Sequence, residues 1–414
     1  MQPVTDNSRH PDALSGLPGY GLLTGSPNQI MNNCEAYCYW RSLSLSVSLG
    51  IGILMCGGQA GLSEEPIQKP IVYFGGFAFA GNASEIPVRY PISNALNIAT
   101  DDGTPLWGRK IREFFQTHRD LLTRVNLEFG VARKEDTSLV LALAMTEEQV
   151  LKEKIGNFNK LVIELGFELV VLDYRGMEVV SSQPVFIELI DAAKEPFSDE
   201  QISERIRKMT VEPDSQLLKS LADRCARVQI RGKNQGTLQV KGVSIGEKAL
   251  PFLPAKYLQG TNTYAQLVAQ EFGALLSSQA GVSLLPFAKD AANTKMALVF
   301  SDASVLQFAI PAPTFAIDLG VRGFKKVLDK SMPAEALWLY GAFLDLKVYE
   351  PEFQQIYFEK PIKFGVSKIV PISQKEVDEY PVVSEALKGA FLEAINQMCK
   401  DKNTQTKVIS KCKL

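Results

Sequence analysis

The most informative feature of this sequence is that one order of segments occurs twice. A hydrophobic run at residues 71–79 leads to Gly-Asn-Ala-Ser, a second run at residues 249–257 leads to Gly-Thr-Asn-Thr, and the glycines at 81 and 260 are 179 positions apart. Both runs precede an amphipathic segment. A strand buries its whole apolar run only when a helix returns across it, so repeated order and spacing imply repeated packing. The sequence therefore predicts two tandem copies of one small α/β domain.

A second pair of segments supports the same repeat. The apolar run at residues 169–174 turns and returns at residues 183–185, and the run at residues 343–349 turns and returns at residues 360–362. Corresponding residues lie 175 to 177 positions apart. We therefore expect the strand at 71–79 to match one at 250–257, and the helix at 106–122 to match one at 264–278. The hairpin that closes at Pro184 should match the one that closes at Pro361.

The predicted elements give each copy a mixed sheet with helices on its faces, which is an α/β fold. The first copy is expected to contain a strand at 71–79, a helix at 106–122, strands at 124–131, 138–145, 158–174 and 177–189, and helices at 198–209 and 214–227. The second copy is expected to contain a strand at 250–257, a helix at 264–278, strands at 282–287, 295–300, 305–317, 336–349 and 353–364, and a helix at 382–398.

Local signals predict several element ends. Thr104 is a candidate helix cap, and Ser198 with Gln201 three positions later has the pattern of a capping box. Gly281 follows a helical segment and is expected to stop it. Gly75-Gly76 interrupts the first strand. Because no G-x-G-x-x-G or G-K-[ST] pattern follows, a bulge or a close-packed position is favoured over a phosphate loop.

The segment between the copies has its own pattern. The polar, glycine-containing stretch at 231–236 is interpreted as a hairpin turn that joins strands at 226–230 and 237–245. The sequence is therefore divided into a leader and signal peptide at 1–60, a first α/β domain at 61–227, a connecting ribbon at 228–248, a second α/β domain at 249–400 and a polar tail at 401–414.

The amino-terminal segment up to Ala60 is typical of an export signal. The apolar run at 43–55 has the length of a signal-peptide core, and Gly-Gln-Ala at 58–60 predicts cleavage after Ala60. A membrane-spanning helix needs about 20 apolar residues, more than this run supplies. A membrane anchor and a buried strand or helix remain the alternatives, and Met1 and Met31 are both candidate translation starts. We expect an exported protein that is periplasmic or associated with the outer membrane.

The cysteines are few. Cys56 directly follows the apolar run at 43–55 and is a candidate lipidation site, although Met55 before it matches a lipoprotein signal poorly. Beyond Ala60 only Cys225, Cys399 and Cys412 occur, too few for a disulfide framework. Cys399 and Cys412 could form one disulfide in an oxidising compartment, and unpaired thiols are the equal alternative.

The composition argues against several function classes. The 44 basic and 46 acidic residues give a net charge of −2, so neither nucleic acid nor a generally anionic surface is an expected partner. The G-x-S-x-G pattern at 242–246 lacks a following helix and a downstream histidine, because the chain has only His10 and His118. No metal or cofactor site is predicted, and no catalytic residue is assigned.

Two charged stretches are interpreted as solvated surface. Glu147-Glu148 with the charged residues at 152–154 has helical spacing and is expected to be an exposed turn. Lys325-Lys326 with Lys330 is a small basic patch, for which a solvated face is also the expectation.

The predicted element order, over residues 70–195 and 249–398, resembles the periplasmic α/β domains of several envelope proteins. These are the curli-secretion lipoprotein, the amino-terminal domain of TolB, penicillin-binding-protein activator lipoproteins and a flagellar assembly protein. The resemblance implies an envelope protein with envelope proteins as partners.

These observations favour a non-enzymatic exported protein that binds or scaffolds in outer-membrane or surface-structure assembly. Homo-oligomers and a peripheral association with the outer membrane are compatible with this expectation, whereas no membrane span is expected in the mature chain. A receptor for a small ligand or glycan in a groove between the copies is one alternative. A hydrolase that relies on carboxylates is the other, and perturbed acidic groups in a deep pocket would favour it.

Overall fold

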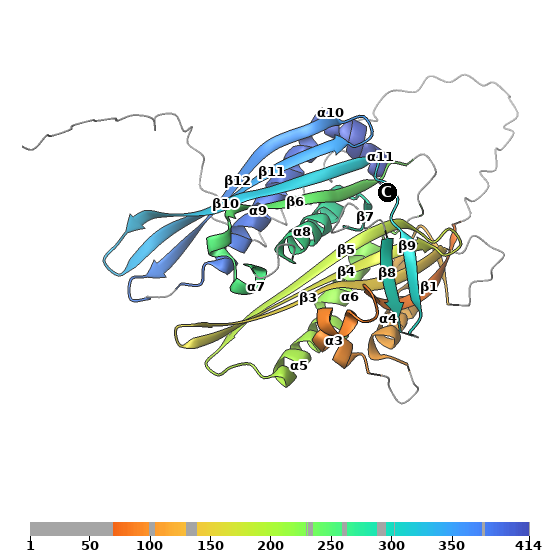
Figure 1. The fold of residues 1–414 in the computed structure, drawn as a ribbon, viewed down its shortest axis with the longest axis horizontal. Helices are drawn as coiled ribbons and strands as arrows, with labels where there is room; N and C mark the ends of the chain where they lie inside the picture. Colours follow the sequence, from red (N-terminus) through yellow and green to blue (C-terminus); the bar gives the residue numbers. More distant parts are fainter. Residues whose placement is uncertain are drawn as a thin grey trace, which may run out of the picture. The chain divides into compact units, whose positions relative to one another are not determined.

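The computed structural model describes residues 69–98, 104–129, 139–228, 230, 235–258, 263–287, 295–301, 303–374 and 377–413. Residues 67–414 form one compact unit, whose elements are drawn in Figure 1. The predicted leader, the cleavage after Ala60 and the lipidation of Cys56 lie outside the described residues. We call residues 69–228 the first half and residues 235–413 the second half.

Both halves contain strands and helices. The strands are β1 (Ile71–Ala80), β2 (Asn126–Glu128), β3 (Leu139–Ile155), β4 (Phe158–Asp173), β5 (Glu178–Ala193), β6 (Leu238–Lys248), β7 (Leu284–Leu285), β8 (Lys295–Phe300), β9 (Val305–Ala309), β10 (Phe315–Ser331), β11 (Glu335–Glu350) and β12 (Gln355–Pro371). The helices are α2 (Ile86–Arg89), α3 (Pro91–Leu96), α4 (Leu106–Thr117), η1 (Arg119–Leu121), α5 (Asp199–Thr210), α6 (Gln216–Cys225), η2 (Leu250–Phe252), α7 (Ala255–Leu258), α8 (Thr263–Ala280), α9 (Tyr380–Lys400), α10 (Lys402–Thr404), η3 (Gln405–Ile409) and α11 (Ser410–Cys412).

All of these strands belong to one mixed sheet, which confirms the predicted α/β class. Its order is β12-β11-β10-β6-β7-β5-β4-β3-β1-β8-β9, and β2 pairs with β1. In the first half β1 is parallel to β3, and β3, β4 and β5 are antiparallel neighbours. In the second half β6 is parallel to β10, and β10, β11 and β12 are antiparallel neighbours. The two halves therefore share one pairing order.

The register of the two halves also corresponds. Glu168 of β4 pairs with Pro184 of β5, and Asp345 of β11 pairs with Pro361 of β12. Asp345 follows Glu168 in the sequence by the same number of residues as Pro361 follows Pro184. The expected match between the two hairpins is thus present at the level of strand pairing.

A β-bulge occurs at the same place in both halves. The register of β3 against β4 shifts between Met145 and Glu147, and that of β10 against β11 shifts between Val321 and Gly323. The extra residues are Thr146 and Arg322, which occupy equivalent positions in the two halves. A bulge leaves backbone groups without ladder partners and bends the strand, so both halves of the sheet bend at equivalent points.

The predicted first strand of the second copy is wrong. Residues 250–257 form η2 and α7, because Pro251 and Pro254 lack the amide hydrogen that a central strand needs. The equivalent of β1 is β6, which pairs with β10 and β7 and not with residues 226–230. The expected ribbon at 228–248 therefore contains the first strand of the second half.

Two more expectations about organisation are wrong. Residues 295–309 belong to the predicted second domain, yet β8 and β9 extend the sheet beside β1 of the first half. The predicted polar tail at 401–414 folds into α10, η3 and α11, and buries Thr404, Val408 and Ile409.

Several local signals behave as predicted. Ser198 and Gln201 form both hydrogen bonds of a capping box at the start of α5. Gly281 follows α8 with φ +65, and the register of β1 shifts between Phe74 and Gly76, as a bulge requires. A Cβ at Gly75 would fall 2.4 Å from Val140 Cγ1, so side-chain space is closed there. The Thr104 cap is wrong, since Pro105 occupies the N-cap position of α4.

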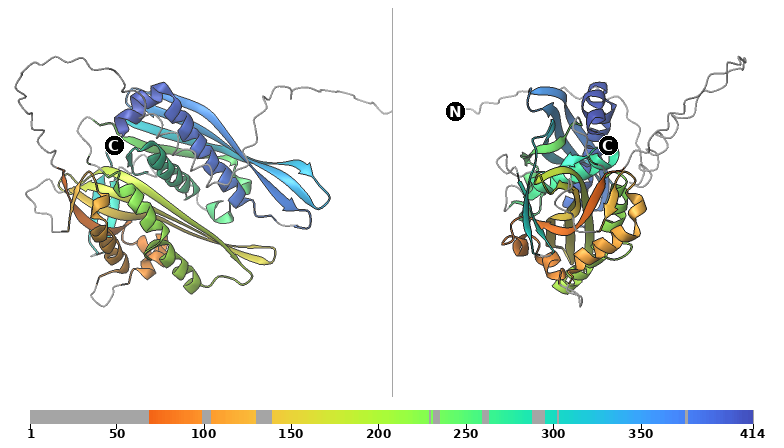
Figure 2. Two further views of the ribbon diagram at one scale, coloured as in Figure 1. Left: turned by 180° about the vertical axis from the view of Figure 1, so that it is seen from behind. Right: turned by 90° about the vertical axis from the view of Figure 1, so that its right-hand side faces the viewer.

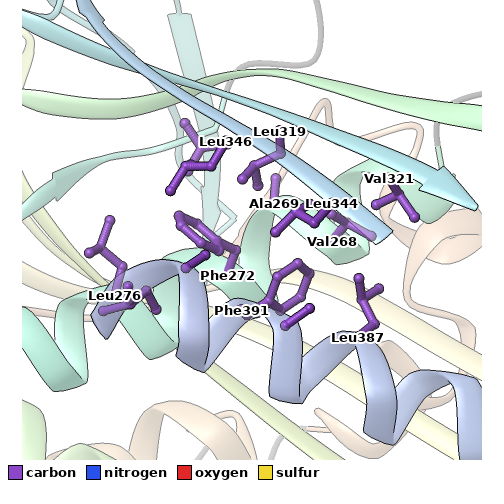
Figure 3. Packing of buried hydrophobic residues seen from close by; sticks show 14 of the residues in the cluster. Val268, Ala269, Phe272, Leu276, Leu319, Val321, Leu344, Leu346, Leu387 and Phe391 are labelled. Atoms are coloured by element: carbon purple, nitrogen blue, oxygen red, sulfur yellow. The ribbon is translucent and has the colours of Figure 1, made fainter. Parts of the chain in front are cut away.

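The halves differ in how their sheets are covered. Helices α4, α5 and α6 pack on one face of the first-half strands around residues such as Phe167 and Leu165. Helix α8 lies between the first-half and second-half strands, where it contacts β5 and β6, and α9 packs on α8, β11 and β12 (Figures 1 and 2). Phe272 of α8 and Phe391 of α9 pack there beneath Leu344 of β11 (Figure 3). Helix α8 thus belongs to the core of the second half and also covers the first.

Candidate functional site

A groove of about 1290 Å³ lies where the two halves meet. The end of β1, α2, α3 and the middle of β3 line it from the first half. Helix α7, the start of α8 and residues of β8 line it from the second half. The groove therefore depends on the packing of both halves, and such junctions are common places for ligand sites.

The bulge at Thr146 forms the floor of the groove. Its carbonyl oxygen accepts hydrogen bonds from Arg89 Nη2 at 3.1 Å and from Gln266 Nε2 at 3.3 Å, and its hydroxyl accepts one from Gln270 Nε2 at 2.7 Å. Arg89 Nη1 also donates to the Ala80 carbonyl at 3.0 Å. Side chains from both halves thus satisfy groups that the strand ladder leaves unpaired at a bulge.

Glu148 fixes one wall of the groove. Its two carboxylate oxygens accept the backbone amides of Ile92 at 2.9 Å and Ser93 at 2.8 Å, which lie in the first turn of α3. Burial raises the pKa of this carboxyl above its ordinary value, although these hydrogen bonds oppose the shift. Both oxygens of Glu148 are therefore engaged in holding α3 against β3.

A second buried carboxyl also lines the groove. Glu168 accepts a hydrogen bond from Ser182 Oγ at 2.6 Å, and burial raises the pKa of Glu168 to about 7. Glu147, also buried, accepts a hydrogen bond from Gln149 Nε2. The prediction that Glu147-Glu148 form an exposed turn is wrong, because both residues belong to β3 and are buried.

Two amide oxygens in the groove wall have no hydrogen-bond partner among the described residues. They are Gln149 Oε1 and Gln270 Oε1, whose residues are 8% and 6% exposed. Gly166 gives the Gln270 amide its space, since a Cβ there would fall 2.0 Å from Oε1. A buried acceptor without a partner costs about 1–3 kcal/mol. Both oxygens are closed to solvent in this structure, so a ligand donor would be favourable once the glutamine side chains turn toward the groove.

The charges around the groove nearly balance. The lining carboxylates are those of Glu85, Glu147, Glu148, Glu153 and Glu168. The lining cations are Arg89, Lys152, Lys256 and Lys295. Burial lowers the pKa of Lys256, whose Nζ donates to the Val150 carbonyl at 3.1 Å. A neutral ligand with many hydrogen-bonding groups suits such a surface better than a strongly charged one.

A separate buried cluster holds the halves together beside the groove. Glu164 of β4 accepts hydrogen bonds from the hydroxyls of Tyr257 and Tyr380, the latter at 3.0 Å, and burial raises the pKa of Glu164 to about 8. Lys160 pairs with Asp378 at 2.6 Å. These partners come from opposite halves, so the cluster is structural.

The residues singled out from the sequence lie elsewhere. Cys399 and Cys412 are thiols and not a disulfide in this structure. His118 ends α4, where its Nδ1 lies 2.9 Å from the Phe114 carbonyl, and residues 242–246 lie within β6. In the described part of the chain no group of three or more His, Cys, Asp or Glu side chains is arranged to hold a metal ion. The described helices also include none long and apolar enough to cross a membrane.

Sequence reasoning did not find the side chains of the groove. Gln266 and Gln270 of α8 meet Thr146 of β3 from far along the chain, so no local pattern links them. The nearest local signal is the i, i+4 spacing of the two glutamines, which places both polar side chains on one face of the otherwise apolar helix α8.

Comparison with known proteins does not identify a family. No family model matches the chain, and no curated protein matches it. A neuraminyllactose-binding hemagglutinin homolog from Helicobacter pylori aligns with a TM-score of 0.26 and 15% identity, over 44% of this chain and 97% of that one. A Xanthomonas campestris protein of the DUF330 family aligns with a TM-score of 0.19 and 12% identity, over 42% of this chain and 86% of that one. Both similarities are too low to bear on function.

Proposed function

We propose that this protein is a non-enzymatic binding protein of the bacterial cell envelope that holds a neutral, hydroxyl-rich ligand such as a glycan in the groove between its halves. The observation that carries the proposal is the pair of buried, unpartnered amide oxygens of Gln149 and Gln270 in a groove that both halves line. A ligand hydroxyl both donates and accepts, so it can satisfy these oxygens and also meet the cations at the rim.

The envelope assignment rests on the predicted export signal at 43–60 and on the expected resemblance to periplasmic domains. A binding role in outer-membrane or surface-structure assembly fits a groove that needs both halves in place, because a bound ligand then stabilises their packing. Envelope proteins remain the expected partners.

Binding of the full chain to an array of bacterial and host glycans tests this proposal. We expect at least one neutral glycan class to bind, and Gln270→Ala to weaken binding about fivefold, the effect of losing about 1 kcal/mol. Gln279→Ala is the matched control, because this glutamine is exposed on the same helix outside the groove. Binding that Gln270→Ala leaves unchanged, or no glycan binding, contradicts the proposal.

A carboxylate-dependent hydrolase is the second candidate, and the raised pKa values of Glu148 and Glu168 in one groove favour it. Against it, both oxygens of Glu148 are held by backbone amides, whereas general acid–base work needs a carboxyl that reaches the substrate. Incubation with nitrophenyl glycosides decides between the two. Turnover that Glu168→Gln abolishes would establish the hydrolase, and glycan binding without turnover supports the binding protein.

A further inference from the structure

The outer face of the second-half sheet carries an apolar cluster that shares no residue with the groove, which we call the arm patch. It consists of Val327, Leu337, Leu339 and Ile369. Val327 pairs with Leu339, and Leu337 pairs with Ile369, so the strand register puts all four on one face. Val327, Leu339 and Ile369 are 41%, 43% and 56% exposed. The opposite face of β11 bears Ala342 and Leu344, which are buried against α8 and α9.

The equivalent positions in the first half are covered. Leu151 and Val162 form the cross-strand pair there that corresponds to Val327 and Leu339, and these two residues are 3% and 0% exposed. They belong to the same core cluster as Tyr257 of the second half. The chain thus shows that this cross-strand pair becomes part of a packed interface where a partner surface is present.

A head-to-tail repeat of that internal interface is unfavourable. The helices that would cover the arm patch in such a repeat are α4, α5 and α6 of another copy. Their outward surface carries charged side chains such as Glu204, Arg207 and Lys208, and no large apolar side chain of these three helices is exposed. An apolar patch gains little from contact with that surface.

The patch is instead complementary to itself. Lys325, Asp329, Lys330 and Glu335 lie around it, so its rim carries both signs of charge. A twofold axis lets the lysines of one copy face the carboxylates of the other while the apolar centres meet. An anionic bilayer would favour a rim of one sign, and the two carboxylates oppose that partner.

The strands that carry the patch are held in place. Lys326 forms an ion pair with Glu379 at the start of α9. The ring of Phe364 packs so closely on Gly389 of α9 that a Cβ there would fall 2.2 Å from Phe364 Cε1. A surface that is already ordered loses little freedom on association, which favours binding.

We propose that two copies of this protein form a twofold-symmetric dimer by packing their arm patches, sheet face against sheet face. This dimer is independent of the groove and of its ligand, so loss of one activity leaves the other testable. Each groove remains open in such a dimer, because its lining residues contain no member of the arm patch.

Sedimentation velocity of the full chain over a range of concentrations tests the dimer. Leu339→Asp should weaken self-association about 30-fold or more, as expected for a central apolar anchor. Leu392→Asp should leave it unchanged, since Leu392 is an exposed leucine on α9 outside the patch. Circular dichroism of both variants confirms folding.

A second measurement locates the contact. Leu339→Cys should give an oxidised covalent dimer through position 339, identified by peptide mapping, whereas Leu392→Cys should give none through position 392. A monomeric wild-type chain at all concentrations, or a dimer that Leu339→Asp preserves, overturns the proposal. Binding to phosphatidylglycerol vesicles that Leu339→Asp abolishes, with a monomeric chain in solution, would assign the patch to a membrane surface and also overturn it.

Discussion

The two halves of this protein share strand order, register and a β-bulge, yet their equivalent residues differ in burial and in bonding partners. Thr146 and Arg322 are the bulge residues of the two halves, but Thr146 is buried and bonded by side chains from both halves, whereas Arg322 pairs with Asp345 at the surface at 3.2 Å. Glu168 is the equivalent of Asp345 and is fully buried with a raised pKa.

The cause of this difference is coverage. Helix α8 and the side chains of Tyr257 and Tyr380 from the second half cover the first-half sheet on the face that its own helices leave open, and nothing in the described chain covers the equivalent face of β10–β12. The same topology thus yields a polar groove at the junction in one half and an apolar, solvent-exposed patch in the other. Burial by the neighbouring half, and not strand order, decides which of two equivalent residues is enclosed.

The largest expected effect comes from the helix that both halves share. Phe272→Ala removes a fully buried ring between the two groups of strands and should lower the free energy of unfolding by about 3–5 kcal/mol. Because α8 packs on β5 as well as on β6, we expect urea to unfold both halves in one transition. Two separate transitions, with only the second half affected, would show that the halves are independent domains.

The next effect is a pH dependence that comes from a buried carboxyl between the halves. Burial raises the pKa of Glu164 from its ordinary value of 4.5 to about 8, so the folded state binds a proton that the unfolded state releases. The free energy of unfolding should therefore fall by about 2–5 kcal/mol as pH rises from 4.5 to about 8. Glu164→Gln should reduce this slope in urea titrations, and Glu168, whose pKa burial also raises to about 7, should account for part of the remaining slope.

The control for this pH dependence is Asp345→Asn, because Asp345 is half exposed and pairs with Arg322 at the surface. It should change the free energy of unfolding by less than about 1 kcal/mol at any pH. An equal slope in the wild type and in Glu164→Gln would mean that Glu164 ionises as it does in an unfolded chain.

A smaller effect should come from one hydroxyl between the halves. Tyr380→Phe removes a donor to Glu164 and should lower the free energy of unfolding at pH 7 by about 1–3 kcal/mol, the cost of a buried acceptor that loses a partner. Tyr357→Phe is the matched control, since its hydroxyl bonds Glu350 on the exposed second-half sheet. Equal, small decreases in the free energy of unfolding for both variants would show that this hydrogen bond does not stabilise the junction more than a surface hydrogen bond does.

Much of the fold was accessible from the sequence wherever the signal is local. The strand predicted at 158–174 is β4 at Phe158–Asp173, and the strand predicted at 295–300 coincides with β8. The run at 250–257 was predicted as a strand because most of its residues are apolar, although its two prolines suit the starts of helices better than a central strand. Hydrophobic periodicity alone does not distinguish a strand from a helix in such a short apolar run.

The groove was not accessible in this way. The burial of Glu148 depends on the amides of α3, which come much earlier in the chain, and a charged pair in a strand is expected to be exposed when only its neighbours are known. The two glutamines of α8 acquire their roles only because a bulge in a distant strand needs donors. Such roles follow from tertiary packing between the halves.

The most direct test of the difference in coverage compares two equivalent positions. Val162→Cys and Leu339→Cys place a thiol at corresponding sites of β4 and β11, and maleimide labelling with peptide mapping reports the access of reagent to each. At a concentration where the protein is monomeric, Leu339→Cys should react more than about tenfold faster, because exposure of the thiol controls its rate. Equal labelling rates at the two sites would contradict the account, since they would mean that the second half does not cover the first-half sheet.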